Sequence, residues 1–339
     1  MLGSREDSAE AATMARGVNV GHYPTAPHDV AVDLLSRYDA IRWANWAQPY
    51  TYSGETLLER RDSPFFGGGA WSAFDGVPLA NIVDAVLEVG SQVNYFNLPY
   101  ALSPDSVERA FAEVDRLNDN QTYVALGMEM WNAAGAYRPQ NEYLKRVVGS
   151  DGYWASQRGA AARIAELARR TGRKFVLEAQ AGNIEVARYA LEQMHVGKHL
   201  SALAIAPYVG RQWFVDQWLR EQGLPASAEN IYAAAVADYQ IHLQPSIVAH
   251  AELAQKHGLP LVWYEFNHHL TGNNDAIRTI VQQRRLVDLL DDVLRFGEKC
   301  GVKAAFMYRL YHAADAGQHW RMFTASGSGV QREPLADLV

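Results

Sequence analysis

The sequence predicts an α/β fold, a single (β/α)8 TIM barrel, because short apolar β-rich segments alternate with longer segments of helical period. The candidate strands number eight, which is the number that closes such a barrel. Glycines just before several strands agree with helices that end there. The predicted strands span residues 16–20, 40–44, 92–96, 122–126, 174–178, 203–206, 260–264 and 303–308.

The segments between most of these strands carry apolar residues at the spacing of an amphipathic helix. Gly172, Gly258 and Gly301 mark three helix ends, since glycine readily takes the left-handed conformation of a helix C-terminus. Asp105, two positions after Ser103, marks the first turn of another helix. The predicted helices span residues 30–35, 79–87, 107–117, 160–168, 186–194, 233–253 and 277–294.

The chain is expected to form one domain. Residues 16–339 make the barrel, and residues 1–15 are a polar N-terminal lead with the composition of a disordered segment. Residues 51–76 are rich in glycine and aromatic residues and are interpreted as a long loop after the second strand. At the C-terminal mouth of a barrel, such a loop either forms one wall of a cleft or covers its own hydrophobic cluster, and the sequence leaves both open.

The composition limits the class of partner. The 339 residues carry a formal net charge of -7 and no block of Lys or Arg, which argues against nucleic acid and favours a neutral ligand. No apolar stretch of the sequence has the length of a membrane span, so no membrane partner is expected. The protein is secreted if a signal peptide was removed and cytoplasmic otherwise. The oligomeric state is left open.

No catalytic metal and no cofactor are expected. Cys300 is the only cysteine, which excludes a multi-cysteine metal site and an intrachain disulfide. The adjacent His268 and His269 would point apart on an extended strand, and the sequence has neither a His-x-His pair on the first strand nor a His-Glu-x-x-His helix. His269 is instead a candidate to bond a substrate hydroxyl or to hold a carboxylate.

Two glutamates stand at the ends of apolar strands. Glu129 follows the strand at 122–126, and Glu265 follows the strand at 260–264. Apolar strands normally end in turn residues, and a buried acid costs desolvation free energy unless another group needs its charge or its proton. Because the C-terminal ends of barrel strands surround one mouth, the fourth and seventh strands bring Glu129 and Glu265 toward each other.

Such a pair suits retaining glycoside hydrolysis, which uses two carboxyl groups roughly 5 Å apart. One is protonated and releases the leaving oxygen, while the other is ionised and attacks the anomeric carbon. Close like charges separate the two pKa values, which supplies both forms near neutral pH. The alternative is that one or both glutamates are ordinary loop acids or members of structural ion pairs.

The residues around both glutamates resemble those of a known family. Glu129-Met-Trp-Asn132 is similar to the Glu-x-Trp-Asn signature after the fourth strand of the clan A (β/α)8 glycoside hydrolases, in which that glutamate is the acid/base. Tyr264-Glu265 resembles their nucleophile position on the seventh strand. The resemblance implies that Glu129 is the general acid/base and Glu265 the nucleophile.

A closer resemblance, which spans residues 16–320, is to bacterial proteins described as cellulose-binding or cellulase-like. Each of its motifs is common alone, and their order is more specific. The motifs are Arg-x-x-x-Trp at 42–46, Gly-x-Pro-Leu at 76–79, Asn-x-Pro at 97–99, Ala-Ile-Ala-Pro-Tyr at 204–208 and Tyr-Glu-x-x-x-His at 264–269. The resemblance implies a carbohydrate substrate or ligand.

Two places depart from the clan A pattern. Those enzymes usually have Asn just before the acid/base, where its side chain bonds the sugar 2-hydroxyl, and this chain has Met128. Because that bond contributes several kcal/mol, either another residue supplies it, the substrate does not need it, or catalysis is weak. Phe266, Asn267 and His268 stand where the family tends to small residues, and they are expected to narrow a subsite.

Further site residues are assigned by the resemblance and by their positions at strand ends. Arg42 would hold Glu265 ionised, with a structural ion pair elsewhere as the alternative. Tyr208 would donate to Glu265 or cap the core. Tryptophans are candidate stacking surfaces and amides candidate partners of hydroxyls, with core packing and loop capping as the alternatives. The predicted substrate-binding residues are Arg42, Trp46, Asn97, Trp131, Asn132, Gln180, Tyr208, His269 and Trp320.

The sequence therefore predicts a retaining glycoside hydrolase that acts on a β-linked oligo- or polysaccharide. A non-catalytic carbohydrate-binding protein on the same barrel is the competing prediction, motivated by Met128. A lyase or isomerase that uses the same acids for proton abstraction is a third. The sequence has no phosphate-cradling glycine loop and no Gly-x-Ser-x-Gly elbow, so nucleotide-binding and serine-hydrolase functions are not expected.

Overall fold

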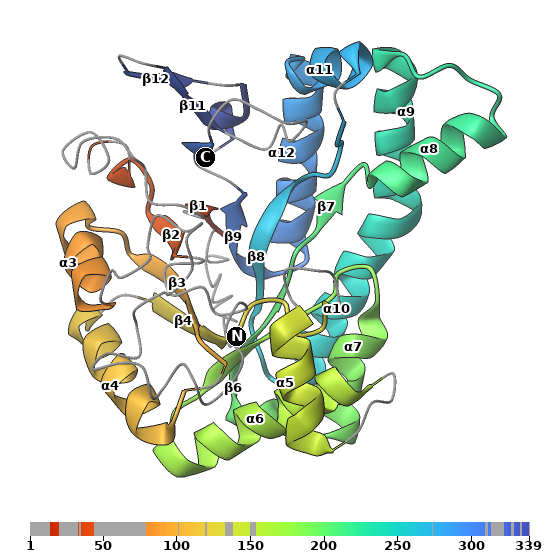
Figure 1. The fold of residues 1–339 in the computed structure, drawn as a ribbon. Helices are drawn as coiled ribbons and strands as arrows, with labels where there is room; N and C mark the ends of the chain where they lie inside the picture. The colour runs from red at the N-terminus through yellow and green to blue at the C-terminus, as the bar shows by residue number, and fades with distance from the viewer. Residues whose placement is uncertain are drawn as a thin grey trace, which may run out of the picture.

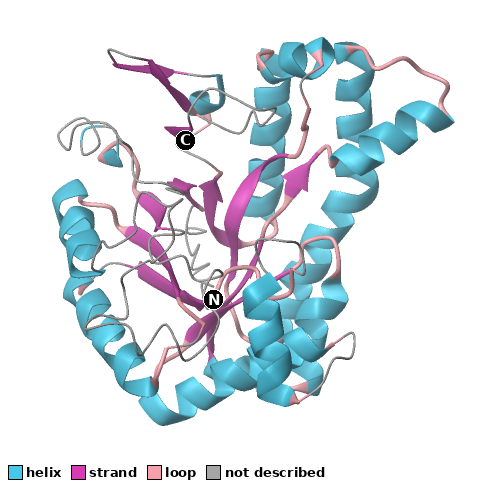
Figure 2. Ribbon diagram, viewed as in Figure 1, coloured by secondary structure: helices cyan, strands magenta, loops and turns pink. Residues whose placement is uncertain are grey.

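Eight parallel strands close into a barrel that helices surround (Figures 1 and 2). In this computed structural model the described residues are 14–19, 33, 35–43, 79–100, 102–118, 121–132, 138–149, 154–272, 274–308, 311–312, 322–326, 329–332 and 334–338. The predicted (β/α)8 TIM barrel is confirmed. The long loop at 51–76 and most of the N-terminal lead lie outside the described residues, so the domain assignment stays a prediction.

All eight predicted strands are present in the barrel, with ends that differ by a few residues. The sheet order runs from β6 back to β1 and then to β9 and β8, and pairing of Leu203 on β6 with Leu261 on β8 closes it. A two-residue strand, β7 (Tyr208–Val209), lengthens the sheet beside the end of β8. The barrel strands are β1 (Ala15–Asn19), β2 (Ala40–Trp43), β3 (Val93–Leu98), β4 (Gln121–Leu126), β5 (Phe175–Ala179), β6 (Leu200–Ile205), β8 (Leu261–His268) and β9 (Val302–Met307).

The helices cover the outside of the barrel, and six of the seven predicted helical segments correspond to observed ones. The seventh, at 30–35, falls largely outside the described residues, and α5 and α8 were not predicted. The α-helices are α3 (Leu79–Val89), α4 (Pro104–Val114), α5 (Arg138–Val148), α6 (Ala155–Thr171), α7 (Ile184–Arg188), α8 (Gln212–Glu221), α9 (Ala228–Asp238), α10 (Gln244–Lys256), α11 (Asp275–Val281) and α12 (Arg284–Lys299). The π-helical turns η3 (Tyr189–Gln193) and η5 (Tyr239–Leu243) extend α7 and join α9 to α10.

Smaller elements complete the described chain. They are the 3-10 turns η1 (Asp115–Leu117), η4 (Val196–His199) and η6 (Pro334–Asp337) and a separate three-stranded sheet of β10 (Tyr311–His312), β11 (Phe323–Ser326) and β12 (Gly329–Arg332). Within the residues that the structure describes, no helix combines the length and the apolar character needed to cross a membrane.

The helix ends follow the predicted chemistry. Gly172, Gly258 and Gly301 have φ angles of 71°, 65° and 83°, which side chains with a Cβ rarely adopt. Ser103 caps α4 by accepting a hydrogen bond from the backbone nitrogen of Ser106, and Asp105 lies in the first turn. These signals are local in the chain, so the sequence alone reveals them.

The core has two parts. The outer cluster packs the barrel strands against the surrounding helices and holds most of the buried apolar side chains. The inner cluster fills the barrel with small alanines and with rings such as Tyr95, Tyr264 and Phe306. Tyr95 and Tyr264 carry hydroxyl groups into the interior, where they become partners of buried acids.

A bulge in β8 sets the direction of Glu265. Trp263 pairs with Ala305 of β9, but the next pair joins Phe266 to Met307, so β8 has one residue more than its partner in this interval. Trp263 and Phe266 both pack in the outer cluster, and Tyr264 faces the barrel interior. The extra residue lets Glu265 follow Tyr264 without turning outward, which an unbroken strand would require.

Candidate active site

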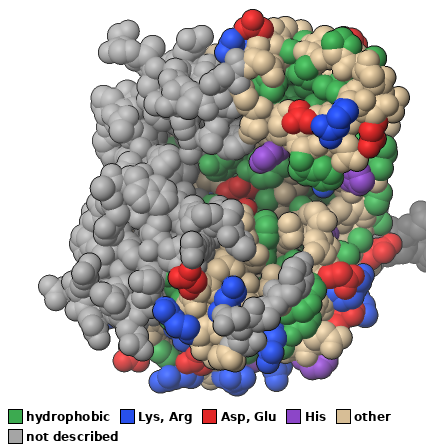
Figure 3. Space-filling view, turned by 45° about the vertical axis from the view of Figure 1, so that its right-hand side comes forward, with side chains coloured by type: hydrophobic (Ala, Val, Ile, Leu, Met, Phe, Trp, Pro, Cys, Tyr) green, Lys and Arg blue, Asp and Glu red, His purple; other side chains and the backbone are tan. Residues whose placement is uncertain are grey.

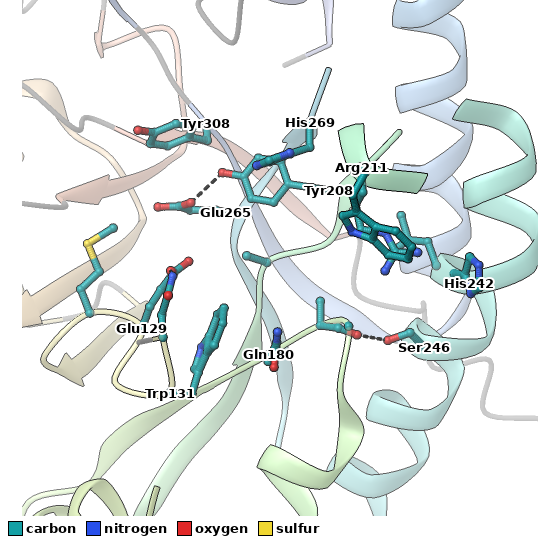
Figure 4. A pocket seen from close by; sticks show the side chains of 17 residues that line it. Glu129, Trp131, Gln180, Tyr208, Arg211, His242, Ser246, Glu265, His269 and Tyr308 are labelled. Carbon is teal, nitrogen blue, oxygen red and sulfur yellow. Dashed lines mark hydrogen bonds between the residues drawn. The ribbon is translucent and has the colours of Figure 1, made fainter. Parts of the chain in front are cut away.

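A cavity of about 690 Å³ lies at the C-terminal ends of the barrel strands. Its lining comes from the segments that follow β4, β5, β6 and β9, from the end of β8, and from η5 and α10. Both Glu129 and Glu265 belong to this lining. Figure 3 shows a hollow in the described surface in which acidic side chains are visible, and Figure 4 shows the two glutamates with their carboxyl groups toward each other.

Glu129 is held in an uncommon backbone conformation. Its φ is 46°, in the left-handed region, and Gly127 two residues earlier has a φ of 71°. A side chain at Gly127 would collide with Met130, so the turn after β4 requires glycine there. The turn closes with a hydrogen bond of 2.7 Å from the backbone nitrogen of Asn132 to the carbonyl oxygen of Glu129. Strain of this kind persists only where surrounding contacts fix it.

Side chains of helix α5 help to hold the turn that carries Glu129. Gln140 bonds both backbone groups of Met128, donating from Nε2 to its carbonyl and accepting from its nitrogen at 3.4 Å. Asn141 donates to the carbonyl oxygen of Asn132 at the far end of the turn. Two side chains of one helix thus bracket the residue that carries the acid.

The Glu129 carboxyl is buried and accepts two hydrogen bonds. Asn132 Nδ2 donates to Oε2 at 2.7 Å, and Tyr264 Oη donates to Oε1 at 3.0 Å. Burial raises the pKa of Glu129 to about 7, and the negative charges of Glu265 and Glu178 act in the same direction against the two hydrogen bonds. Near neutral pH a large fraction of Glu129 therefore carries its proton.

Glu265 has a contrasting environment. Arg42 Nη1 donates to Oε1 at 2.6 Å, and Asn19 Nδ2 lies 3.4 Å from the same oxygen. Tyr208 Oη donates to Oε2 at 2.7 Å (Figure 4). A buried guanidinium and two further donors thus surround this carboxyl group, and contacts of this kind are charge-assisted and hold it in one orientation.

A third buried acid, Glu178 at the end of β5, connects the two. Its Oε2 accepts a hydrogen bond of 2.6 Å from the backbone nitrogen of Glu129. Its Oε1 accepts from Tyr95 at 2.8 Å and from Asn97 at 2.7 Å, and it lies 3.7 Å from Arg42 Nη2. Glu178 was not predicted as a site residue: it ends an apolar strand, as Glu129 and Glu265 do, but no motif of the resemblance stands around it.

Arg42 is the positive centre of this network. It is fully buried, and its guanidinium lies over the rings of Tyr95 and Tyr264, with Cζ 5.4 and 5.0 Å from their centroids. Burial alone would lower the pKa of Arg42, but the charges of Glu265 and Glu178 outweigh it and raise the pKa. One guanidinium therefore compensates charge on two carboxylates that serve different parts of the site.

The predicted substrate-binding residues fall into three groups. Trp131, Asn132, Gln180, Tyr208 and His269 line the cavity. Arg42 and Asn97 are not among the lining residues: Arg42 contacts Glu265, as the sequence predicts, and the Asn97 amide donates to Glu178 and to the Gly127 carbonyl oxygen and accepts from Arg42 at 3.2 Å. Their part in substrate binding stays a prediction. Trp46 and Trp320 lie outside the described residues.

The residues after Glu265 differ from expectation. Phe266, Asn267 and His268 are fully buried and are not among the residues that line the cavity, so they do not narrow it. His269 does line it, which agrees with the opposite directions expected for the two adjacent histidines. Burial lowers the pKa of His269 and favours its neutral ring. Within the described ranges, no cluster of three or more His, Cys, Asp or Glu side chains is suited to a metal ion.

Known proteins resemble this chain in fold and not in sequence. No protein-family model matches the chain, and no curated protein does. The resemblance to cellulose-binding or cellulase-like bacterial proteins therefore stays a prediction.

Solved structures similar to this chain are barrel glycoside hydrolases. A protein of Parabacteroides distasonis ATCC 8503, provisionally assigned as a glycoside hydrolase, matches with a TM-score of 0.50 over 88% of this chain and 87% of its own, at 14% identity. An endo-β-1,4-mannanase of Cellulomonas fimi has a TM-score of 0.47 over 91% of this chain and 67% of its own, at 12% identity. A Bacteroidetes-affiliated GH5 cellulase has a TM-score of 0.38, with 87% and 81% covered, at 11% identity. At these identities the likeness concerns the fold alone.

Proposed function

We propose that this protein is a retaining glycoside hydrolase that acts on a β-linked oligo- or polysaccharide. In this proposal Glu129 is the general acid/base and Glu265 the nucleophile. The observation that carries it is the pair of buried carboxyl groups in one cavity with opposite electrostatic surroundings. Retaining hydrolysis needs one protonated and one ionised carboxyl group at the same moment.

In the first step, Glu265 attacks the anomeric carbon and forms a glycosyl ester, while Glu129 gives its proton to the departing glycosidic oxygen. The contact of Arg42 with Oε1 and that of Tyr208 with Oε2 hold the attacking carboxylate in one orientation. The raised pKa of Glu129 supports its role as donor, because a proton held to about pH 7 is available under ordinary conditions.

In the second step, the deprotonated Glu129 takes a proton from water, and the resulting hydroxide displaces the ester at the anomeric carbon. Glu265 leaves as a carboxylate and Glu129 is protonated again, so both groups return to their starting states. Two displacements at one carbon give a product with the anomeric configuration of the substrate.

Met128 supports a second candidate, a carbohydrate-binding protein without turnover. Its side chain lines the cavity just before Glu129, so no amide at this position is available to a sugar hydroxyl. Asn132 and Gln180 are amides that also line the cavity, and Gln180 is the better substitute because Asn132 already donates to Glu129. Binding without release of sugar would favour this candidate.

The test is a screen of β-linked polysaccharides and aryl β-glycosides with the unmodified chain. We expect release of reducing sugar from at least one substrate, and proton NMR of the first product is expected to show the anomer of the substrate. An inverted first product would contradict the retaining mechanism. Full turnover by both Glu129→Gln and Glu265→Gln would contradict the assignment of the two glutamates.

The pH dependence is expected to follow the proton on Glu129. Burial raises the pKa of this carboxyl to about 7, so the protonated acid is lost as the pH rises through that value. The rate kcat/KM on an unactivated glycoside should therefore fall about tenfold for each pH unit above about 7.5. A rate that stays constant from pH 7 to pH 9 would exclude Glu129 as the proton donor.

Glu178→Gln is expected to slow turnover and to move the basic limb of the pH profile to lower pH. The amide cannot replace both acceptor oxygens, so contacts to the Glu129 backbone or to Asn97 weaken, and the rate falls about tenfold. Loss of the Glu178 charge removes one cause of the raised pKa of Glu129. Kinetics over pH 5–9 measure both effects.

Glu185→Gln is the matched control for that substitution, since Glu185 is an exposed acid in α7 that pairs with Arg188. The control is expected to leave both rate and pH profile unchanged. A Glu178→Gln variant with a slower rate but an unmoved basic limb would show a purely structural role.

A further inference from the structure

The cavity continues from the two glutamates to a second wall, formed by the start of α8 together with η5 and α10. Arg211, Trp213, His242 and Ser246 line this wall. Figure 4 shows Arg211, His242 and Ser246 across the cavity from the glutamates. The volume of about 690 Å³ is in the range of roughly 300–1,000 Å³ that accommodates drug-sized ligands, so it offers room for more than one sugar ring.

Trp213 presents an unusually exposed aromatic surface at this wall. The residue is 57% exposed although it lines the cavity. The ring is held from the protein side, with the Arg211 guanidinium 4.9 Å from its centroid and Phe214 edge-on at 6.0 Å. Phe214 in turn contacts the ring of His242 at 5.0 Å. A fixed, exposed indole in a cavity is a binding surface ready for a flat apolar face, at little cost in side-chain entropy.

Arg211 adds directed hydrogen-bond donors beside that indole. Its Nε and Nη2 and its backbone nitrogen all donate to the carboxylate of Asp238, which is fully buried. Among the described residues Nη1 has no hydrogen-bond acceptor, while the rest of the guanidinium is fixed by Asp238. A guanidinium held in this way presents the two N–H groups of Nη1 in a constant direction.

Gly182 lies next to Nη1 in the cavity lining. A Cβ built on Gly182 would stand 3.7 Å from Arg211 Nη1, and both residues line the cavity. Ser246 ties α10 to the same loop by donating to the carbonyl oxygen of Ala181 (Figure 4). The position of the loop relative to this wall is therefore fixed by a direct hydrogen bond.

The charges at this wall favour a neutral ring. Asp238 compensates Arg211, and at the glutamate end of the cavity the single guanidinium of Arg42 faces two acids, Glu265 and Glu178. An added carboxylate or sulfate on the ligand would meet an excess of negative charge in the cavity as a whole. Hydroxyl oxygens accept from Nη1 without that cost.

We propose that Trp213 and Arg211 form a second sugar-binding subsite, which we call the α8 subsite, and that the ligand is a neutral oligosaccharide with a further ring stacked on Trp213. The indole takes the C–H face of a pyranose, and Nη1 of Arg211 donates to its hydroxyl oxygens. The inference rests on the proposed function, which places the reacting sugar ring beside Glu129 and Glu265. It adds that a ligand of one ring leaves part of the site empty.

The test is calorimetric titration of the full chain as Glu265→Gln, so that turnover does not interfere. The probes are the β-1,4-linked hexaoses of mannose, glucose and galactose, the corresponding monosaccharides, and a hexa-uronide as the acidic probe. We expect at least one neutral hexaose to bind, with its monosaccharide at least about tenfold weaker. Failure of all three neutral hexaoses to bind, or tighter binding of the acidic probe, would overturn the proposal.

Variants added to that background locate the subsite. Trp213→Ala is expected to weaken hexaose binding about tenfold, and Trp213→Phe, which keeps a ring, should weaken it less. Arg211→Lys keeps a cation beside Asp238 but removes Nη1, and a several-fold loss is expected. Affinity for the monosaccharide should not change in any of them.

Ile241→Ala is the matched control, because Ile241 is also 57% exposed and lies on η5 but does not line the cavity. Equal hexaose affinities for Trp213→Ala and Ile241→Ala would refute the α8 subsite. The proposed hydrolase function fails separately: hexaose binding that depends on Trp213, without turnover by the unmodified chain, would keep the subsite and reject the hydrolase.

Discussion

Glu265→Gln is expected to lower kcat/KM at least about 10³-fold on every glycoside that the protein hydrolyses, because an amide cannot form the glycosyl ester. The same loss of kcat/KM is expected on activated aryl glycosides, since a better leaving group does not replace the carboxylate oxygen that attacks. The measurement is initial-rate kinetics on an unactivated oligosaccharide and on its dinitrophenyl analogue.

The fold of this variant has to be checked, because Arg42 is fully buried and loses one of its two charged partners. Glu178 remains 3.7 Å from the guanidinium, so the variant is expected to fold with a lowered melting temperature. Glu229→Gln is the surface control, since Glu229 pairs with Arg285 outside the site. A folded Glu265→Gln protein with more than a tenth of the original rate would remove Glu265 from the mechanism.

Glu129→Gln is expected to show a loss that depends on the leaving group. On an unactivated glycoside, loss of the proton donor should cost about 10²–10⁴-fold in kcat/KM. On a dinitrophenyl glycoside, whose leaving group needs no proton, formation of the glycosyl ester should be nearly unaffected and its hydrolysis slow. A burst of dinitrophenol followed by a slow steady rate is therefore the expected time course.

Azide provides the companion measurement for this residue, because it attacks without a general base. With Glu129→Ala it is expected to speed the steady phase and to give a glycosyl azide with the configuration of the substrate. If Glu129→Gln lowers kcat/KM equally on the unactivated and the dinitrophenyl glycoside, and no burst is seen, Glu129 does not act as the acid/base.

The barrel could be predicted from the sequence because its signals are local. Strand and helix periods, and helix ends such as Gly172 and Gly258, each depend on a few neighbouring residues. Helix α5 was not predicted because its sequence is largely polar and has Pro139 in its first turn. Helix α8 was not predicted because its aromatic residues obscure a short helical period.

Glu129 and Glu265 could be found because each ends an apolar strand and also stands in a short local motif, Glu129-Met-Trp-Asn132 and Tyr264-Glu265. Glu178 could not be recognised, because its partners Tyr95, Asn97 and the Glu129 backbone lie 83, 81 and 49 positions away in the chain. The bulge that directs Glu265 could not be predicted either, because it exists only in the pairing of two strands: β8 has one residue more than β9 in the same interval. Trp213 and Arg211 belong to the site only because the segment after β6 folds back over the barrel mouth.

The enclosed carboxyl group of Glu129, next to the acids Glu265 and Glu178, makes the stability of the folded chain depend on pH. Because the pKa of Glu129 is raised from 4.5 to about 7, its protonated side chain supports folding fully below pH 4.5, and that support is lost as the pH rises from there through 7. Glu129→Gln and the parent protein should melt alike below about pH 4, with the variant melting higher at pH 8. Selection of variants for thermal stability at alkaline pH would therefore enrich inactive proteins. A search for more stable variants has to measure turnover as well as stability.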